Sequence, residues 1–318
     1  HYMPVSYIPY DLQKGYIHHW LIAGPQAIAV QTSESLSDGA SKTQIAQHYY
    51  EEESGIHQLP VEPGPLKESM FTVADYEGQW AYFSCAEDHF VDLTAFSPSY
   101  RYLRAWAYTQ LECARAQAVS LVLTTHGPSD VWLNGSHIHR SETFGLHHDT
   151  FEALLHEGAN ELLVRFEQIG ERACMHQFAL RISGPVNGVN TRVPTAIVDI
   201  AHRNKLEAMF NRAYLDRDVF TRDEMITVHW PDDLGTSDDL TIRLQTPSRR
   251  IYAESKATAA PEQPSTLVRS HDAPQGLLHL RFLPRQELFY EKNLRVLRKI
   301  PLWGMGLQAY SEAPYGTY

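Results

Sequence analysis

Apolar and polar residues alternate with a period of two along much of the first half of the chain, and this pattern predicts β-strands. Val131 and Leu133 lie on one side of such a strand and lead directly into Asn134-Gly135. This dipeptide tolerates the positive φ angles of a type I′ turn better than most others. The segment therefore predicts a tight hairpin whose second strand runs from Ser136 toward Arg140.

A longer strand is predicted after the turn at residues 158–160. Its apolar positions share one face and its polar positions alternate with them: the apolar set is Leu162, Val164 and Phe166, and the polar set is Glu161, Arg165 and Glu167. Such alternation is typical of a strand with one buried face. Leu163 is the exception to the pattern.

Two further strands are predicted between Arg101 and Gly127, with a polar turn near residues 114–117. Their β-branched and aromatic side chains favour strands over helix. The segment from Thr32 to Lys67 is different, because it is polar and rich in serine and proline. It predicts a long irregular connection.

One helix is predicted over residues 199–216. Asp199 is a suitable N-cap, and apolar residues recur at helical spacing at Leu206, Met209, Phe210, Ala213 and Tyr214. Strand patterns return afterwards in MITVHW, DDLTIRLQT, RRIYAES and GLLHLRFLP. Short strands separated by Pro- and Gly-rich turns predict a second β-sandwich of immunoglobulin-like type. The fold class is therefore all-β, with two sandwiches and one helix at their junction.

The hairpin region resembles the galactose-binding-like jelly roll that accompanies many glycoside hydrolases. The matching residues are Val131, Leu133, Asn134, Gly135, Asp149, Phe151, Leu154, Leu155, Glu157, Gly158, Asn160, Leu162 and Val164. Trp20, Gly24 and Pro25 are similar to the W-x-x-x-G-P stretch that often begins such modules. The same sandwich serves in sugar binding, in inter-domain packing and in building catalytic clefts, so the resemblance does not fix the ligand.

The resemblance and the turn residues together imply three parts. Residues 1–186 are expected to form the galactose-binding-like jelly roll, with a boundary marked by Gly184, Pro185 and Gly188. Residues 187–303 are expected to form the immunoglobulin-like sandwich with its leading helix. Residues 304–318 are expected to be a tail, or a linker to a catalytic domain of the same parent chain, because accessory sandwiches of this type usually precede one.

The charge balance narrows the range of partners. The chain has 27 Lys and Arg against 38 Asp and Glu, a formal net charge of −11, and no dense basic block. Nucleic acids and anionic membranes require concentrated positive charge, so neither is an expected partner. A neutral carbohydrate is compatible with an acidic surface. No apolar run reaches the roughly 20 residues of a membrane helix, and no signal peptide is recognisable.

Three cysteines are an odd number without a C-x-x-C pair, which disfavours a disulfide framework and a structural zinc site. Cys85, Cys113 and Cys174 are expected to be reduced thiols. This favours the cytoplasm, although a mature exported protein would have the same pattern.

The candidate ligand-binding residues lie on the predicted strands around the hairpin: Trp80, Trp132, His137, His139, His147 and His148. Aromatic rings stack on sugars, and histidines bond their hydroxyl groups. Filling of the core is the competing interpretation for the aromatic set Trp80, Tyr82, Trp106, Tyr108 and Trp132. The histidines with Asp149 have the residue types of a metal site, but their spacing misses the cupin pattern and a metal is not expected.

No motif assigns catalysis to particular residues. Glycoside hydrolysis generally needs two carboxylates about 5 to 10 Å apart, and none of the 38 acidic residues is singled out by a signature. No cofactor is expected. The sequence thus predicts a non-catalytic part of a larger carbohydrate-active enzyme that binds carbohydrate through the first sandwich. The alternatives are a structural spacer for a catalytic domain and, thirdly, a complete hydrolase.

Overall fold

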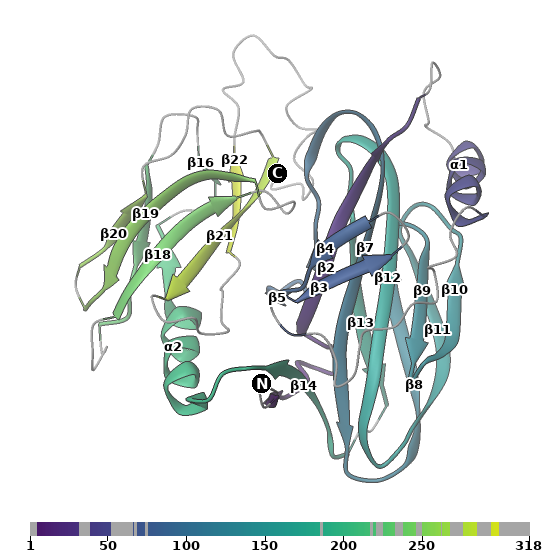
Figure 1. Ribbon diagram of the computed structural model, residues 1–318, viewed down its shortest axis with the longest axis horizontal. Coiled ribbons are helices and arrows are strands. Elements are labelled where there is room, and N and C mark those ends of the chain that lie inside the picture. Colours follow the sequence, from purple (N-terminus) through teal and green to yellow (C-terminus); the bar gives the residue numbers. More distant parts are fainter. Residues whose placement is uncertain are drawn as a thin grey trace. The chain divides into compact units, whose positions relative to one another are not determined.

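The computed structural model describes residues 5–31, 39–51, 66, 69–73, 76–184, 187–216, 219–220, 225–232, 238–245, 250–261, 263–267, 276–284 and 294–298. Strands dominate these residues, so the protein is an all-β sandwich protein (Figure 1). The chain divides into two compact units. The first runs to Ala196 without the short segment Thr94–Phe96, and the second begins at Ile197. The predicted tail 304–318 lies outside the described residues.

Among the described residues, fourteen strands belong to the first unit. They are β1 (Ser6–Tyr10), β2 (His19–Ala29), β3 (Met70–Val73), β4 (Tyr76–Gln79), β5 (Ala81–Ser84), β6 (Val91–Asp92), β7 (Phe96–Cys113), β8 (Gln117–Thr125), β9 (Ser129–Leu133), β10 (Ser136–Ser141), β11 (His147–Leu155), β12 (Gly158–Ala173), β13 (Gln177–Ser183) and β14 (Val189–Thr195). An eight-stranded sheet has the order β1-β14-β7-β12-β9-β10, with β2 and β5 attached to it, and a four-stranded sheet has the order β11-β8-β13-β6. A separate hairpin is formed by β3 and β4.

The two large sheets enclose an apolar core. Val131, Val164 and Phe166 of the eight-stranded sheet join Leu121 and Leu180 of the four-stranded sheet in this cluster. We call the side of the eight-stranded sheet that faces this core its inner face, and the opposite side its outer face. The apolar residues predicted from the alternating pattern of β12 lie on this inner face.

The predicted hairpin is confirmed. β9 and β10 pair in antiparallel fashion around Asn134 and Gly135, whose φ angles are 49° and 81°. The Asn134 side chain also fixes the turn to β12, because its Oδ1 accepts a hydrogen bond of 2.8 Å from the Glu161 N–H. Asn134 Nδ2 donates to Asn160 Oδ1 at 2.9 Å. Asn134 therefore tolerates the turn geometry and also bonds the neighbouring strand.

The prediction that β12 buries one face is incomplete, because both of its faces are buried. Leu162, Val164 and Phe166 are buried on the inner face as expected. Arg165 and Glu167 on the outer face are also buried, with 0% and 2% of their surface exposed. A polar position in an alternating strand can therefore be as enclosed as an apolar one when other parts of the chain cover its side chain.

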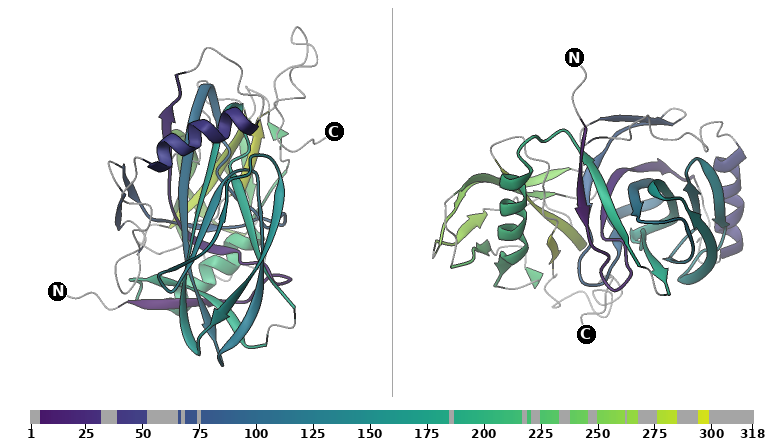
Figure 2. Two further views of the ribbon diagram at one scale, coloured as in Figure 1. Left: turned by 90° about the vertical axis from the view of Figure 1, so that its right-hand side faces the viewer. Right: turned by 90° about the horizontal axis from the view of Figure 1, so that it is seen from below.

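The predicted irregular connection from Thr32 to Lys67 contains a helix, α1 (Gly39–Glu51). Ala46 of this helix packs with Tyr102 of β7 and Ile169 of β12, and Figure 2 shows the helix running across the strands of the first unit. The segment is mostly polar, and only a few apolar residues are needed for one face of a helix to contact the sheet. The apolar pattern that would predict a helix is therefore weak here. The remainder of this segment lies mostly outside the described residues.

The first unit extends beyond the predicted boundary at residue 186. β14 pairs with β1 through Ser6 and Thr195, and with β7 through Cys113 and Val189. Gly184 and Gly188 lie at the ends of the connection between β13 and β14. These glycines accompany a turn within the first unit, and local turn chemistry does not distinguish such a turn from a domain boundary.

In the described part of the second unit lie the helix α2 (Ile200–Arg212) and eight strands in two sheets. The strands are β15 (Tyr214–Leu215), β16 (Val219–Phe220), β17 (Ile226–His229), β18 (Asp238–Gln245), β19 (Ile251–Ala259), β20 (Ser265–Leu267), β21 (Gly276–Pro284) and β22 (Leu294–Arg298). Their sheet orders are β15-β17-β20 and β16-β22-β21-β18-β19.

The predicted helix is confirmed over Ile200–Arg212, but it is shorter than expected: Ala213 is its C-cap, and Tyr214, expected on its apolar stripe, begins β15 and is 58% exposed. Asp199 is the N-cap, and its carboxylate accepts a hydrogen bond of 2.9 Å from the His202 N–H.

Phe210 packs on Phe282 of β21 and on Trp230, with ring centroids 5.3 and 6.3 Å away. The apolar stripe of α2 therefore covers the core of the second unit. In the described part of the chain, neither helix is long and apolar enough to cross a membrane.

Candidate functional site

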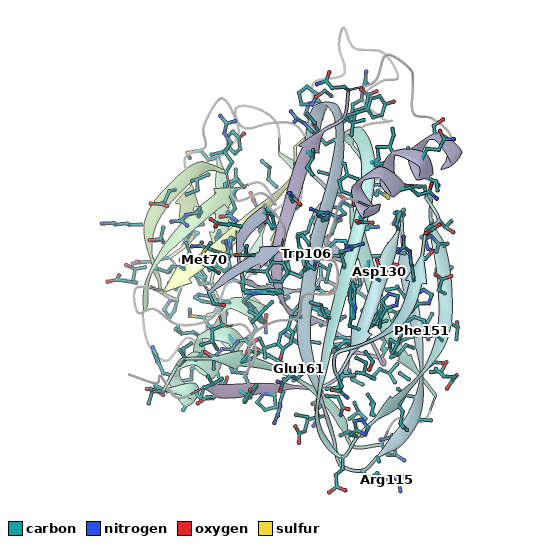
Figure 3. All side chains as sticks on the ribbon, turned by 45° about the vertical axis from the view of Figure 1, so that its right-hand side comes forward. Met70, Trp106, Arg115, Asp130, Phe151 and Glu161 are labelled. Carbon is teal, nitrogen blue, oxygen red and sulfur yellow. The ribbon has the colours of Figure 1, made fainter. Side chains whose placement is uncertain are left out.

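Two edge strands carry most of the predicted ligand-binding residues. β10 is the last strand of the eight-stranded sheet, and β11 is the last strand of the four-stranded sheet. In Figure 3, Asp130 marks β9, next to β10, and Phe151 marks β11. Side chains from these edges meet where the two sheets come together. His137 and His139 lie on β10, and His147 and His148 begin β11.

His139 and His147 converge on Asp149. His139 Nε2–H donates to Asp149 Oδ2 at 3.0 Å, and His147 Nε2 lies 3.6 Å from the same oxygen. His147 Nδ1–H donates to the Gly145 carbonyl at 2.9 Å, so in the neutral ring Nε2 accepts from the Ser141 hydroxyl at 2.8 Å. The His139 ring stacks on Phe151 with centroids 4.2 Å apart. The polar atoms of these histidines therefore take part in hydrogen bonds that join the two edge strands.

His137 lies apart from this group although it is two residues from His139. The pairing of β10 with β9 shifts register between the two histidines, so the simple rule that i and i+2 residues act together fails here. His137 Nε2–H donates to Asp130 Oδ1 at 2.8 Å, and its ring lies 5.2 Å from that of Trp132. Of its side chain, 34% is exposed.

The remaining predicted residues do not join either group. His148 is exposed and bonds the Thr124 hydroxyl at 2.8 Å. Trp80 packs edge-on against Phe71, with centroids 4.9 Å apart. Trp80 and Trp132 are only 1% and 2% exposed, so neither ring forms an open surface on which a sugar could stack. Among the described residues, no group of three or more His, Cys, Asp or Glu side chains could hold a metal ion.

The aromatic residues of the outer face fill space within the first unit. Trp80, Tyr82, Trp106, Tyr108 and Trp132 are all buried, as the core-filling interpretation requires. Tyr76 of the β3–β4 hairpin stacks on Trp106 with centroids 5.5 Å apart. The Tyr108 hydroxyl donates to Glu161 Oε1 at 3.1 Å, and burial, followed by the charge of Glu161, raises the pKa of Tyr108.

Charged side chains on the same face form a buried network, which we call the outer-face network: Asp130, Arg165, Glu167, Tyr102 and His137. Arg165 Nη2 lies 3.1 Å from Asp130 Oδ2 and 3.6 Å from Glu167 Oε1. The Tyr102 hydroxyl donates to the same Glu167 oxygen. Arg165 and Asp130 are direct cross-strand neighbours on β12 and β9. Because the carboxylates already have partners, this network is a structural feature of the sheet.

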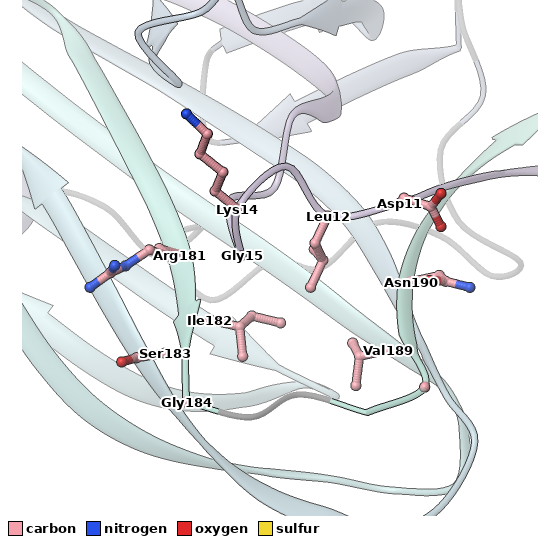
Figure 4. Close-up of a pocket in the computed structure, with 11 residues that line it drawn as sticks. Asp11, Leu12, Lys14, Gly15, Arg181, Ile182, Ser183, Gly184, Val189 and Asn190 are labelled. Atoms are coloured by element: carbon pink, nitrogen blue, oxygen red, sulfur yellow. The ribbon is translucent and has the colours of Figure 1, made fainter.

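A cavity of about 530 Å³ opens at a different place in the first unit. It lies between the turn at Lys14-Gly15, which connects β1 to β2, and the connection from β13 to β14. We call it the end cavity. Leu12, Ile182 and Val189 lie in its middle (Figure 4). Its volume is within the range of small-molecule sites, which combine apolar walls with a few placed polar groups.

Polar residues flank this apolar middle, where Ile182 and Val189 are only 2% and 5% exposed, and the Arg181 and Asn190 side chains point away from it (Figure 4). Arg181 and Ser183 lie on one side, and Asp11 and Asn190 lie on the other (Figure 4). Lys14 projects from the turn above them. Carboxylate, amide, hydroxyl and guanidinium groups can together donate to and accept from hydroxyl groups of a ligand. The end cavity is therefore a candidate binding geometry among the described residues.

Sequence patterns contain little indication of this site. Its residues come from positions 11–15 and 181–190, which are brought together only by the sheet topology. Gly184 and Gly188 were visible as turn residues, but they were interpreted as a domain boundary. The local signal that could have been used is the pair Lys14-Gly15, which reads as a short turn.

Neither a protein-family model nor a curated protein matches this chain. Solved structures with a similar fold include a family 35 carbohydrate-binding module from an environmental isolate, with 16% identity and a TM-score of 0.21 over 31% of this chain and 74% of the module. The β-glucosidase of Kluyveromyces marxianus is 9% identical with a TM-score of 0.28 over 73% of this chain and 50% of that protein.

A β-glycosidase from Bacteroides vulgatus is 11% identical with a TM-score of 0.28, over 92% of this chain and 33% of the enzyme. The chain therefore spans a third to a half of the two glycosidases that it matches. At these identities the similarity is one of fold alone.

Proposed function

We propose that the first unit is a non-catalytic carbohydrate-binding sandwich of the galactose-binding-like type. In this proposal the second unit is an immunoglobulin-like sandwich, and both accompany a glycoside hydrolase catalytic domain of the same parent chain. The end cavity is the observation that carries the proposal, because Asp11, Ser183 and Asn190 bring hydrogen-bonding groups to the margin of a space of about 530 Å³. A pyranose ring carries hydroxyl groups that such groups can bond.

The groups in the end cavity favour binding over hydrolysis. Asp11 is the only acidic side chain among the described residues that line it. Hydrolysis by the usual mechanism needs a second carboxylate across the scissile bond. Stacking and a few hydrogen bonds in an open site must also overcome the cost of association. Dissociation constants between micromolar and millimolar, roughly −8 to −4 kcal/mol, are therefore expected.

The edge residues His137, His139, His147 and His148 remain a second location for the same function, as the sequence predicts. Most of their polar atoms are already bonded within the protein, so a ligand there would have to replace existing hydrogen bonds. His137 and His148 are the better candidates of these, because both are exposed whereas His139 and His147 are half-buried. Structural support of a catalytic domain is the alternative function.

A glycan array probed with the purified chain tests the proposal. Asn190→Ala removes an exposed amide of the end cavity, and His137→Ala removes an exposed edge histidine. We expect binding of at least one glycan that is weakened by Asn190→Ala and retained by His137→Ala. The reverse pattern would move the site to the edge. If the folded chain binds no glycan, the structural-support alternative replaces the proposal.

A further inference from the structure

We propose that Asn187 is a site of spontaneous deamidation, at which the side chain closes a succinimide ring with the main chain and water opens the ring again. The sequence contains two Asn-Gly pairs, Asn134-Gly135 and Asn187-Gly188. Glycine after asparagine favours this reaction, because no side chain blocks the approach to its backbone nitrogen. The surroundings of the two pairs differ, and only those of Asn187 permit the reaction. This inference is independent of the proposed carbohydrate-binding function.

The reaction needs only groups of the chain and water. The Gly188 backbone nitrogen attacks Cγ of Asn187, the new C–N bond closes the ring, and Nδ2 leaves as ammonia. The proton of the Gly188 N–H passes to solvent, and the departing nitrogen takes a proton from it. Water then breaks one of the two bonds between a ring carbonyl and the ring nitrogen. Opening at the side-chain carbonyl gives aspartate, and opening at the main-chain carbonyl gives isoaspartate.

The two reacting groups at Asn187 have no other partners in the part of the chain that the structure describes. Asn187 and Gly188 lie in the connection between β13 and β14, and both are exposed. Their carbonyls are held, because Gln117 Nε2 donates to that of Asn187 at 3.3 Å and the Ala114 N–H donates to that of Gly188 at 2.9 Å. Neither the Asn187 side chain nor the Gly188 N–H makes a hydrogen bond to a described residue. Cγ can therefore turn toward the Gly188 nitrogen without breaking a contact.

The turn itself requires the glycine on which the reaction depends. Gly188 has a φ of 69°, and a Cβ atom there would lie 2.9 Å from the Ala114 Cβ. Any larger residue would be strained in this conformation and would have to displace Ala114. The reactivity of Asn187 therefore follows from the way in which the chain enters β14.

The Asn134-Gly135 pair is protected by its own contacts. Asn134 Oδ1 accepts from the Glu161 N–H at 2.8 Å, and Nδ2 donates to Asn160 Oδ1 at 2.9 Å. Attack by the Gly135 nitrogen would require the Asn134 side chain to rotate, and this rotation breaks both bonds. Two hydrogen bonds of ordinary strength correspond to a rate that is lower by about tenfold or more. The same dipeptide is thus reactive at one turn and protected at the other.

Deamidation changes the charge and the main chain beside the end cavity. Gly188, Val189 and Asn190 line this cavity, and either product adds one negative charge next to them. Isoaspartate also inserts a methylene group into the main chain just before β14, where Val189 pairs with Cys113 of β7. A protein preparation that has aged is therefore a mixture of asparagine, aspartate and isoaspartate forms at the margin of the candidate site.

Peptide mapping of the folded full chain tests the inference. Trypsin releases the two pairs on separate peptides, residues 116–140 and 182–192. After incubation in warm, mildly alkaline buffer, mass spectrometry should show deamidation of 182–192 at an initial rate at least about tenfold above that of 116–140. Fragmentation should place the change at Asn187. In urea the contacts of Asn134 are lost, and the two rates should approach each other.

Asn187→Gln is the sharpest variant, because the longer side chain would have to close a larger ring and reacts far more slowly. It should abolish the deamidation of peptide 182–192 and leave the melting temperature unchanged, since it replaces an exposed side chain. Asn190→Gln is the matched control. Asn190 is also exposed and lies in the same peptide, but Thr191 follows it and hinders the attack. This variant should leave the deamidation rate unchanged.

Three results would overturn the inference. The first is an equal rate for the two peptides of the folded chain. The second is a change located at Asn190, or one that persists in Asn187→Gln. The third is an Asn187 that reacts in urea but not in the folded chain, which would show that the turn holds its Cγ away from the Gly188 nitrogen. None of these measurements uses a glycan, so their outcome is separate from that of the proposed function.

Discussion

On β12 both faces of the eight-stranded sheet are buried, but the inner face is apolar and the outer face carries charged groups beside apolar ones. On β12 the inner face carries Leu162, Val164 and Phe166, and the outer face carries Leu163, Arg165 and Glu167. The inner face is stabilised by removal of apolar surface from water. The charged groups of the outer face gain nothing from that effect, and they stay buried only because each has an oppositely charged or hydrogen-bonding partner.

This difference has consequences for substitution. A lost apolar group leaves a cavity in proportion to its volume, and neighbouring side chains close it only partly. A lost member of an ion network leaves the other members buried without a partner, although removing all of them together can be almost neutral. The two faces should therefore respond differently to single and to combined substitutions.

Phe166→Ala on the inner face should have the largest effect. The ring is fully buried and packs on Phe178 with centroids 4.7 Å apart. The free energy of unfolding should fall by roughly 3 to 5 kcal/mol, measured by urea denaturation followed by tryptophan fluorescence. Leu154→Ala, at a side chain that is 59% exposed on β11, should change it by less than about 0.5 kcal/mol. Similar losses for both would contradict the inner-face assignment.

Arg165→Met on the outer face should cost about 3 kcal/mol in the same measurement, because Asp130 and Glu167 would remain buried without their shared cation. This loss of stability should lie at the lower end of the range for breaking a buried ion pair, because His137 still bonds Asp130 and Tyr102 still bonds Glu167. Adding Asp130→Asn and Glu167→Gln should restore part of the stability. If the combined variant is still less stable than Arg165→Met, packing of these side chains, and not their charges, stabilises the network.

The surroundings of Phe166 should also make stability depend on pH through His176. Burial lowers the pKa of His176 to about 4, and a hydrogen bond of 3.0 Å from its Nε2–H to the Phe166 carbonyl opposes this only in part. Between pH 6.5 and pH 4 the unfolded chain therefore binds the proton and the folded chain does not. Stability should fall as the pH falls, by on the order of 2 kcal/mol between pH 7 and pH 5.

The comparison with His176→Gln isolates this residue, because burial and the neighbouring His89 also lower the pKa of His18 to about 4. Both histidines act in the same direction, so the unsubstituted chain reports their sum. The variant should lose a smaller amount of stability over this pH range. Parallel profiles for the two proteins would show that His176 is not the titrating group.

Tyr102→Phe should have the smallest effect of the four. It deletes the hydroxyl that donates to Glu167 and leaves the ring in place against α1. A hydrogen bond to a charged group contributes about 1.5 kcal/mol or more, so a loss near that value is expected on urea denaturation. Tyr252→Phe makes the same chemical change at a partly exposed site in the second unit and should have almost no effect. A Tyr102→Phe protein as stable as its parent would remove the tyrosine from the network.

The sequence was sufficient wherever a short segment determines its own conformation. Asn134-Gly135 specified the hairpin because few residue pairs accept two consecutive positive φ angles. Asp199 and the stripe ending at Phe210 specified α2 for equally local reasons, namely a side-chain cap and a spacing of three and four residues. The same local pattern was too weak for α1, whose polar composition resembles that of a loop.

The candidate site was less accessible to sequence reasoning. The six predicted residues were chosen because aromatic and histidine side chains suit sugars, and all six do lie in the first unit. Trp80 and Trp132 proved to be buried, and a register shift assigned His137 and His139 to different carboxylates. Neither burial by a distant segment nor a one-residue irregularity in pairing leaves a trace in the pattern of alternation.

By itself, the sequence determined the all-β class, the hairpin at Asn134, the inner apolar face of β12 and the capped helix α2. Only the tertiary structure decided that the outer face of β12 is also buried, that β14 joins the first sheet, and that residues 11–15 and 181–190 line one cavity. The physical reason is the range of the interactions. Turns, caps and periodicity act over a few residues, whereas sheet order and register also depend on contacts between strands far apart in the sequence, such as β1 with β14.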